Sequence, residues 1–321
     1  MKRACLFVTI ALFAVAVGSA GAAVWTEYAN SPTGKDINAI KMLDVDNGWA
    51  VGYWGEILRY QNGQWSVYYT WATQYLQDVD FGSANFGMAV GYQGSAILWN
   101  GSSWVYADIP TTRHIWGVVV PPGQDDVAWA VGQRGTLYRW AGGTSGSWSK
   151  WDLGMTRALH DIFFTSATDG WLCGQDGRVF HFDESTWSAV NASTANDFYC
   201  IYALSPNNVW VGGTNGALYH YEGVSWAKTY TPTTATIREM SFLGPTSGWA
   251  VCDDGVLLRY NGVEWKVVNI NPETTKNFSG MYMVNARNGW AVGQEGMIYS
   301  YRDNPSVEPS SIGRVKALFT N

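Results

Sequence analysis

The sequence predicts an all-β protein, a seven-bladed β-propeller of four-stranded antiparallel blades closed by the N-terminal strand. Three observations lead to this prediction. A unit of about 40 residues recurs along the chain. The composition includes 19 Trp and 36 Gly among 321 residues, which favours strands and tight turns over a helical bundle. The segment after the apolar N-terminus also matches a piece that the last unit lacks.

Residues 1–23 have the order of a secretory signal peptide. Lys2 and Arg3 precede an apolar run over residues 4–17, and small residues follow up to Ala23. We expect cleavage near Ala22 and export to the periplasm, the cell surface or the medium. The alternative is an uncleaved anchor, but the apolar run is shorter than the roughly 20 residues that cross a bilayer. We therefore expect no stable membrane insertion after cleavage.

The mature chain is expected to be acidic. Removal of Lys2 and Arg3 leaves 18 basic against 26 acidic side chains, a net charge of about −8. This charge argues against nucleic acid or anionic lipid as the main partner.

Three cysteines follow the leader, Cys173, Cys200 and Cys252. They are too few for a disulfide scaffold and show no Cys-x-x-Cys spacing for zinc or redox chemistry. We interpret them as small buried hydrophobic residues. The alternative is a bridge between Cys173 and Cys200, because an exported protein meets oxidising conditions.

Seven segments align with one another and define the repeat. Each contains a glycine that closes a predicted three-residue hairpin loop, and an aromatic residue follows five positions later. The glycine is expected to have a positive φ, which it adopts without a Cβ penalty. The segments are Trp49–Tyr60, Met88–Trp99, Trp129–Trp140, Trp171–Phe182, Trp210–Tyr221, Trp249–Tyr260 and Trp290–Tyr301. Their glycines are Gly55, Gly94, Gly135, Gly177, Gly216, Gly255 and Gly296.

Each unit predicts four strands in order. An apolar run such as Ile37–Met42 forms the first, and the Trp-Ala-Val-Gly run forms the second. The third ends at the aromatic residue, and a further turn leads into a fourth strand that opens with a Trp. The strands are apolar on both faces because each blade packs between two others. The opening residues of the fourth strands are Trp65, Trp104, Trp148, Trp187, Trp226 and Trp265.

The last unit ends at Tyr301 without a Trp-led fourth strand. The segment Val24–Tyr28 matches Gln64–Tyr68, and Trp25 precedes Trp65 by 40 residues, which is one repeat. We therefore expect the N-terminal strand to complete the last blade, so that the propeller spans residues 24–303. A solenoid also repeats, but it would not need its first strand to complete its last unit.

The pattern Trp-Ala-Val-Gly-x-x-Gly-x-Ile, followed by an aromatic residue, a turn and a Trp, resembles the degenerate Asp-box or BNR-like repeats of the photosystem II assembly and stability factor family and of related exported bacterial propellers. The resemblance covers residues 24–303. It implies a non-enzymatic propeller that holds a membrane-protein precursor, with a cluster of arginines on one face. Asp-box turns proper read Ser-x-Asp-x-Gly-x-x-Trp, whereas Tyr60–Trp65 and Tyr260–Trp265 keep only the turn and the Trp.

One face of the predicted propeller collects the loops before the first strands and the hairpin tips between the second and third strands. The tips differ in sequence while their flanking residues repeat, as expected of a scaffold with an adaptable binding face. On this face we predict an aromatic and basic sector, opposed by Asp253, Asp254 and Glu295, because aromatic residues and arginines carry binding energy at protein interfaces. Its residues are Trp54, Tyr75, Tyr92, Arg113, His114, Trp116, Arg134 and Arg157, with Arg238 as a further candidate. The alternative is that they are turn residues that pack on their own blades.

No catalytic site, metal site or cofactor is predicted. A sialidase-type glycosidase needs an arginine triad, but Arg113, Arg157 and Arg238 occupy different registers within their units. His181 and His220 share one strand position in adjacent units, which indicates strand residues rather than metal ligands. Neither a phosphate-binding glycine loop nor a Gly-x-Ser-x-Gly elbow is present.

We therefore expect a monomeric, non-catalytic scaffold that binds a protein partner, of the assembly-factor or envelope-factor type. A carbohydrate-binding lectin is the alternative, and a sialidase-like glycosidase is the third possibility. A lectin predicts several equivalent pockets, whereas a protein-binding scaffold predicts one asymmetric patch. Residues 304–321 lie outside the repeats and begin with a Pro/Ser-rich linker. They are either a docking or sorting segment or a disordered extension.

Overall fold

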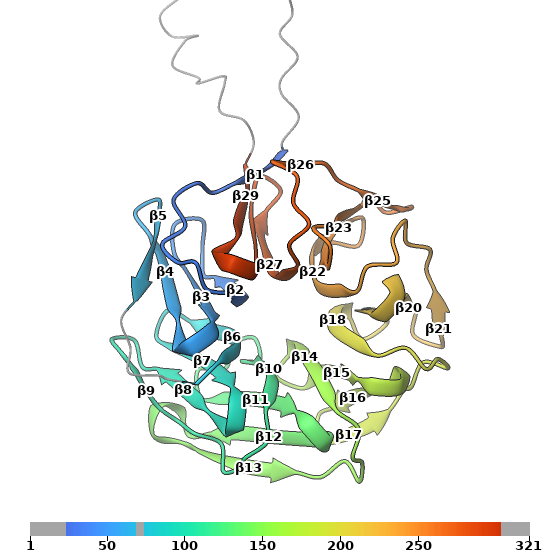
Figure 1. Ribbon diagram of the computed structural model, residues 1–321. Coiled ribbons are helices and arrows are strands. Elements are labelled where there is room, and N and C mark those ends of the chain that lie inside the picture. The colour runs from blue at the N-terminus through green and yellow to red at the C-terminus, as the bar shows by residue number, and fades with distance from the viewer. Residues whose placement is uncertain (1–23, 69–73, 303–321) are drawn as a thin grey trace, which may run out of the picture. The chain divides into compact units, whose positions relative to one another are not determined.

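The computed structural model describes residues 24–68 and 74–302. They form seven sheets arranged as the blades of a ring around a central channel (Figure 1). The predicted seven-bladed propeller is confirmed. The predicted signal peptide (1–23) and C-terminal tail (304–321) lie outside the described residues. Within the described ranges, no helix is long and apolar enough to cross a membrane.

Each blade is a meander of four antiparallel strands. The inner strands, next to the channel, are β2 (Ile37–Met42), β6 (Leu76–Ser83), β10 (Ile115–Val119), β14 (Leu159–Ser166), β18 (Phe198–Ser205), β22 (Ile237–Gly244) and β27 (Phe278–Asn285). The second strands are β3 (Gly48–Gly52), β7 (Phe86–Gly91), β11 (Val127–Gly132), β15 (Asp169–Gly174), β19 (Asn208–Gly213), β23 (Ser247–Cys252) and β28 (Asn288–Gly293). The third strands are β4 (Ile57–Gln61), β8 (Ala96–Trp99), β12 (Thr136–Ala141), β16 (Val179–Asp183), β20 (Leu218–Tyr221), β24 (Leu257–Tyr260) and β29 (Ile298–Arg302). The outer strands are β5 (Gln64–Tyr68), β9 (Trp104–Tyr106), β13 (Ser147–Trp151), β17 (Thr186–Ala189), β21 (Trp226–Lys228), β25 (Trp265–Val267) and β1 (Val24–Glu27).

The N-terminal strand closes the ring as predicted. β1 pairs antiparallel with β29, with Trp25 opposite Tyr301. Trp65 lies opposite Tyr60 in the same way in the first blade, so the last blade repeats the register of the others. A short strand that the sequence did not predict, β26 (Ile270–Asn271), adds a parallel partner on the other side of β1. The closing strand is therefore held on both edges.

The hairpin tips differ from the prediction in one respect. The sequence predicted a positive φ only for the glycine that ends each tip. In the first blade, however, Trp54 has φ 59° and Gly55 has φ 67°, and the Glu56 N–H donates to the Tyr53 carbonyl at 3.2 Å. Two consecutive positive φ values are those of a type I′ turn, whose twist matches that of the flanking strands. The middle residue is non-glycine in every tip: Trp54, Gln93, Arg134, Asp176, Asn215, Asp254 and Glu295.

The tip glycines are required by packing as well as by conformation. A Cβ on Gly216, whose φ is +64°, would lie 2.0 Å from the carbonyl oxygen of Thr233 in the loop that leads to the next blade. A Cβ on Gly255 would likewise lie 1.9 Å from the carbonyl oxygen of Thr274. The tip of one blade thus packs directly against the loop that leads into the next.

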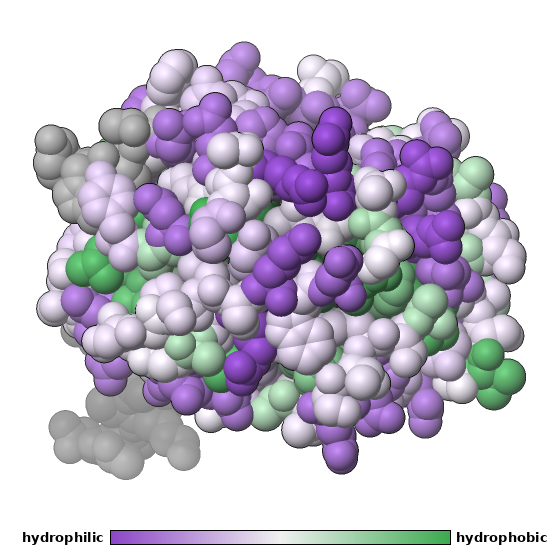
Figure 2. All heavy atoms as spheres, turned by 90° about the horizontal axis from the view of Figure 1, so that it is seen from below, coloured by the Kyte–Doolittle hydropathy of each residue, from purple (hydrophilic) through white to green (hydrophobic). Residues whose placement is uncertain are grey.

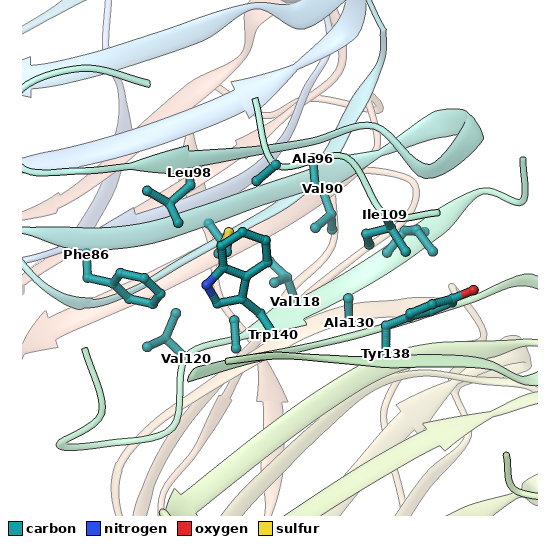
Figure 3. Close-up of a cluster of buried hydrophobic side chains, with 14 residues drawn as sticks. Phe86, Val90, Ala96, Leu98, Ile109, Val118, Val120, Ala130, Tyr138 and Trp140 are labelled. Atoms are coloured by element: carbon teal, nitrogen blue, oxygen red, sulfur yellow. The ribbon is translucent and has the colours of Figure 1, made fainter. Parts of the chain in front are cut away.

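The hydrophobic core lies between blades. Figure 3 shows one such layer, in which Phe86 and Leu98 from the second blade meet Val120 and Trp140 from the third. All four side chains are buried. In the view of Figure 2, hydrophilic residues cover most of the molecule and hydrophobic residues form only small separate areas. The apolar side chains are therefore buried mainly between the blades.

The three cysteines of the described chain, Cys173, Cys200 and Cys252, are free and buried. The alternative of a Cys173–Cys200 bridge is wrong for this structure. Burial raises the pKa of the Cys173 and Cys200 thiols well above the ordinary value. The thiols are therefore held in the protonated form and act as small apolar side chains.

Candidate functional site

Every inner strand carries a β-bulge near its start, at the same position in all seven blades. In β2 the pairing with β3 passes from Ile37 to Ala39 and skips Asn38. Strict alternation would place Asn38 and Ala39 on opposite faces, but a bulge redirects the side chains beside it. Both residues consequently line the channel, as do the equivalent pairs in β6, β14 and β22.

The residues at the bulges form a ring at one end of the channel, here called the mouth ring. All of its members line a cavity of about 480 Å³. Seven equivalent positions carry seven different side chains, so the site is asymmetric although the scaffold repeats. The members are Asn38, Gln77, Trp116, His160, Tyr199, Arg238 and Ser279.

The rim of the cavity comes from the hairpin tips and the loops that lead into the inner strands. The side-chain oxygens of Gln175, Asn277 and Gln294 accept backbone N–H groups of Ala158, Asp254 and Asn277, at 2.9–3.0 Å. Their amide nitrogens remain as hydrogen-bond donors. The cavity therefore opens on the predicted loop-rich face and has donors around its rim.

Aromatic rings form one wall of the mouth. The His160 ring stacks on Tyr199 at 4.5 Å between centroids and lies tilted against Trp116 at 5.0 Å. His160 Nδ1 lies 2.7 Å from the Phe198 carbonyl oxygen, so Nδ1 carries a proton and donates it. Burial lowers the pKa of His160, which favours the neutral ring. Nε2 of this neutral ring is then a hydrogen-bond acceptor.

Arg238 forms the opposite end of the same wall. Its guanidinium lies 4.8 Å from the centre of the Tyr199 ring, and its Nε and Nη2 each donate to the Asp253 carboxylate at 2.8 Å. Asp253, which was predicted to oppose the aromatic and basic sector, is the ion-pair partner of Arg238 on its own blade. This arginine is a predicted site residue that the structure places at the cavity.

Three carboxyl groups form the floor of the cavity, one layer below the mouth ring. Asp78, Asp161 and Glu239 occupy the same position in the second, fourth and sixth blades. The first two each accept two backbone N–H groups, one from their own strand and one from Val118 or Ile201 in the next blade. Glu239 Oε1 accepts only the N–H of Met240, at 2.9 Å. Asp78 and Asp161 therefore also join neighbouring blades.

Burial raises the pKa of all three floor carboxyls. The pKa of Asp78 is raised to about 6 and that of Asp161 to about 8, in each case mainly by desolvation and further by nearby acidic groups. The pKa of Glu239 is raised well above its ordinary value by desolvation and by the charge of Asp161. At neutral pH the floor therefore combines an ionised Asp78 with Asp161 and Glu239, which favour their protonated forms.

A further layer lies below the floor. Lys41 Nζ pairs with Asp80 at 2.6 Å and lies 5.1 Å from the centre of the Tyr282 ring. The second carboxylate oxygen of Asp80 accepts the N–H of Val120 at 2.7 Å. Lys41 is thus committed to Asp80. In residues 24–68 and 74–302, no cluster of three or more His, Cys, Asp or Glu side chains is arranged to hold a metal ion.

Four of the predicted site residues form an aromatic band beside the cavity rather than in it. Trp54 contacts Tyr75 edge to face at 5.0 Å, Tyr75 contacts Tyr92 at 5.1 Å, and Tyr92 stacks on His114 at 4.1 Å. Tyr53 stacks on Tyr75 at 4.6 Å and also lines the cavity. The band is therefore continuous with the cavity.

The predicted arginines of the third and fourth blades do not line the cavity. Arg113 Nη1 donates to the Arg134 carbonyl at 3.2 Å and lies 3.3 Å from Thr136 Oγ1. Arg157 pairs with Asp176 at 2.7 Å. Since only the third arginine of the conceivable sialidase triad reaches the cavity, these residues do not form that triad.

The floor carboxyls were not predicted, because the first strand of each unit was expected to be an apolar run. Three of these runs, Leu76–Phe81, Leu159–Phe164 and Ile237–Phe242, contain Asp78, Asp161 and Glu239. A signal was present, because aligning the seven units places an acidic residue at the third position of alternate runs. An acidic residue that recurs at one position of a strand beginning with a buried apolar residue indicates a channel-facing position.

The fold and the mouth define a class: a BNR-like, seven-bladed β-propeller with an asymmetric, carboxyl-rich cavity at the mouth of its channel. The family model described as "Photosynthesis system II assembly factor YCF48" matches residues 130–261. This match confirms the resemblance that the repeats predicted.

Several solved structures share the fold. The chain is similar to "YCF48 bound to D1 peptide", with 17% identity and a TM-score of 0.69 over 87% of this chain and 96% of that one. It is also similar to YCF48 from Cyanidioschyzon merolae, with 15% identity and a TM-score of 0.71 over 87% and 99% of the two chains. Virginiamycin B lyase from Staphylococcus aureus shows 12% identity and a TM-score of 0.74 over 86% and 98%. At these identities the similarity shows the fold alone, and no curated protein matches by sequence.

Proposed function

We propose that this chain is an exported, non-catalytic scaffold that binds a protein partner, of the assembly-factor or envelope-factor type, through the face around the channel mouth. The observation that supports this proposal is the mouth ring, in which seven equivalent positions carry seven different side chains. A lectin built on the repeats would present equivalent pockets, whereas this ring presents one asymmetric cavity. The structure described as YCF48 bound to D1 peptide supports the use of this fold for peptide binding.

The surroundings of the cavity also suit a protein interface. The aromatic band from Trp54 to His114 adjoins the cavity, and the Trp54 side chain is 63% exposed. Large aromatic side chains that are partly exposed around a concave site provide much of the binding energy in protein complexes. The cavity with its aromatic band is therefore the surface that we assign to the partner.

Site-specific photo-crosslinking in the native host tests this proposal. A photoreactive amino acid at Gln77 in the mouth ring, or at Trp54 in the aromatic band, should crosslink one and the same protein. The control position is Val67 on the outer strand β5, which is 50% exposed and should give no such product. Equal crosslinking from Val67, or no product from the mouth, contradicts the proposal.

Two further measurements separate the alternatives. A glycan array probed with the purified protein should show no binding that depends on Trp116. Mass spectrometry of the exported protein should find its N-terminus close to residue 23. A cell-associated chain that retains residues 1–23 contradicts the export part of the proposal.

A further inference from the structure

We infer that the mouth cavity receives an arginine side chain of the bound partner, whose guanidinium reaches the carboxyl groups of the floor. This inference rests on the proposed function, since it requires a protein partner at the mouth, and it adds the chemistry of the anchoring residue. It is drawn from the distribution of acceptors, donors and aromatic rings in the cavity.

The cavity contains more acidic than basic side chains. Asp36, Asp78, Asp161, Glu239 and Asp253 line it, and Arg238 is the one arginine among the lining residues. Arg238 already forms a bidentate pair with Asp253. Below the floor, the charge of Lys41 acts on Asp78 and Glu239, but its ion pair is with Asp80. A ligand that brings a positive charge from the mouth would therefore meet the Asp78 carboxylate and would favour loss of the protons on Asp161 and Glu239.

Two acceptor atoms in the cavity lack a donor among the described residues. Glu239 accepts the Met240 N–H through Oε1, and no described group donates to its Oε2. His160 donates from Nδ1 to the Phe198 carbonyl, which leaves Nε2 as an acceptor. Both residues line the cavity, so a ligand can reach these atoms. A guanidinium group provides several N–H donors for them, and its positive charge would displace the proton that the Glu239 carboxyl holds.

Arg238 already shows how a guanidinium group binds at the cavity wall. Arg238 stacks against Tyr199 and binds a carboxylate with two nitrogens. Trp116, on the other side of His160, offers a further aromatic surface at the mouth. A planar guanidinium suits stacking and carboxylate pairing better than an ammonium group does, so we assign arginine rather than lysine.

The rim supports a peptide rather than a free amine. The amide nitrogens of Gln175, Asn277 and Gln294 remain as donors, because their side-chain oxygens are held by backbone N–H groups. Donors at the rim fit the carbonyl oxygens of a peptide backbone, and acceptors on the floor fit the N–H groups of its side chain. The volume of about 480 Å³ accommodates one long side chain.

A peptide array with purified protein tests the inference. Immobilised decapeptides with randomised flanks carry Arg, citrulline or Glu at the centre, where citrulline keeps the shape of arginine without its charge. We expect the Arg peptides to bind at least about tenfold more strongly than the citrulline peptides. Glu239→Gln and Asp161→Asn should each remove this preference. Glu264→Gln, an exposed position on the same blade as Glu239, should retain it.

Equal binding of Arg and citrulline peptides, or a preference that survives both floor substitutions, overturns the inference. Thermal unfolding of each variant establishes that it is folded before binding is compared. Failure of the inference is distinct from failure of the proposed function. If Gln77 crosslinks a partner but the array shows no preference for arginine, the partner binds without an arginine anchor. If Gln77 crosslinks no protein, the proposed function itself fails.

Discussion

Replacement of Trp25 by alanine should destabilise the whole propeller, although this residue lies at the start of the described chain. Trp25 is fully buried, with 0% exposure. Its ring contacts Trp249 at 5.7 Å and Tyr301 at 5.3 Å, which belong to the sixth and seventh blades. The side chain therefore packs across the junction at which β1 closes the ring.

The expected loss follows from this burial. Truncation of a buried Trp to Ala costs about 3–5 kcal/mol. Trp25 Nε1 is buried without a hydrogen-bond partner, so removing the indole also removes an unsatisfied donor, which returns about 1 kcal/mol. We therefore expect a net loss of about 3 kcal/mol in the free energy of unfolding for Trp25→Ala. Trp25→Phe, which removes the donor but keeps a ring, should cost about 1 kcal/mol.

Urea unfolding followed by far-ultraviolet circular dichroism measures both values. The matched control is Trp54→Ala, which truncates an exposed Trp on a hairpin tip and should change stability by less than about 0.5 kcal/mol. A loss below about 1 kcal/mol for Trp25→Ala, or equal losses for Trp25 and Trp54, would refute the argument that β1 closes the ring energetically.

Two further predictions concern pH and the hairpin tips. Because the pKa of Asp161 is raised to about 8 and that of Glu239 is also raised, the folded state holds protons that the unfolded chain releases above about pH 4. Stability should therefore fall as the pH rises from 6.5 to 8, by up to about 1.4 kcal/mol per pH unit for each retained proton. Thermal unfolding at several pH values should show a shallower decline for Glu239→Gln. A flat wild-type profile would contradict the raised pKa of the floor carboxyls. Gly216→Ala should cost about 2–4 kcal/mol in urea unfolding, from the positive φ and the overlap with the Thr233 carbonyl. Gly154→Ala, where φ is +65° and no atom lies within 4 Å of the added Cβ, should cost only about 1 kcal/mol, and equal losses would show that the overlap is relieved.

The repeating features of the fold could be predicted from the sequence. The pairing of Tyr60 with Trp65, and of Tyr301 with Trp25, follows from a pattern that occurs in every unit. The β-bulge at Asn38 could not be predicted in this way, because it is a shift in pairing between two strands. The positive φ of Trp54 was missed for a related reason, since the turn type is set by the twist of the hairpin and overrides the preference of the residue.

The candidate site was predicted less completely than the fold. Trp116 and Arg238 line the cavity, whereas Arg113 and Arg157 are held by groups outside it. These residues were selected for their chemical type and for their place on the loop-rich face. The β-bulge, one residue into each inner strand, decides which of them reach the channel. The shift in pairing there turns two neighbouring side chains toward the channel, which strict alternation would not predict.

The position of β1 between β29 and β26 has a consequence for the order in which the molecule is made. A growing chain produces β1 first, but both of its pairing partners come from the last part of the propeller. The first strand must therefore wait, unpaired, until nearly the whole polypeptide has been synthesised. A prematurely terminated product lacks β29 and leaves β1 with an open edge, which distinguishes it from the finished protein for a protease or a chaperone.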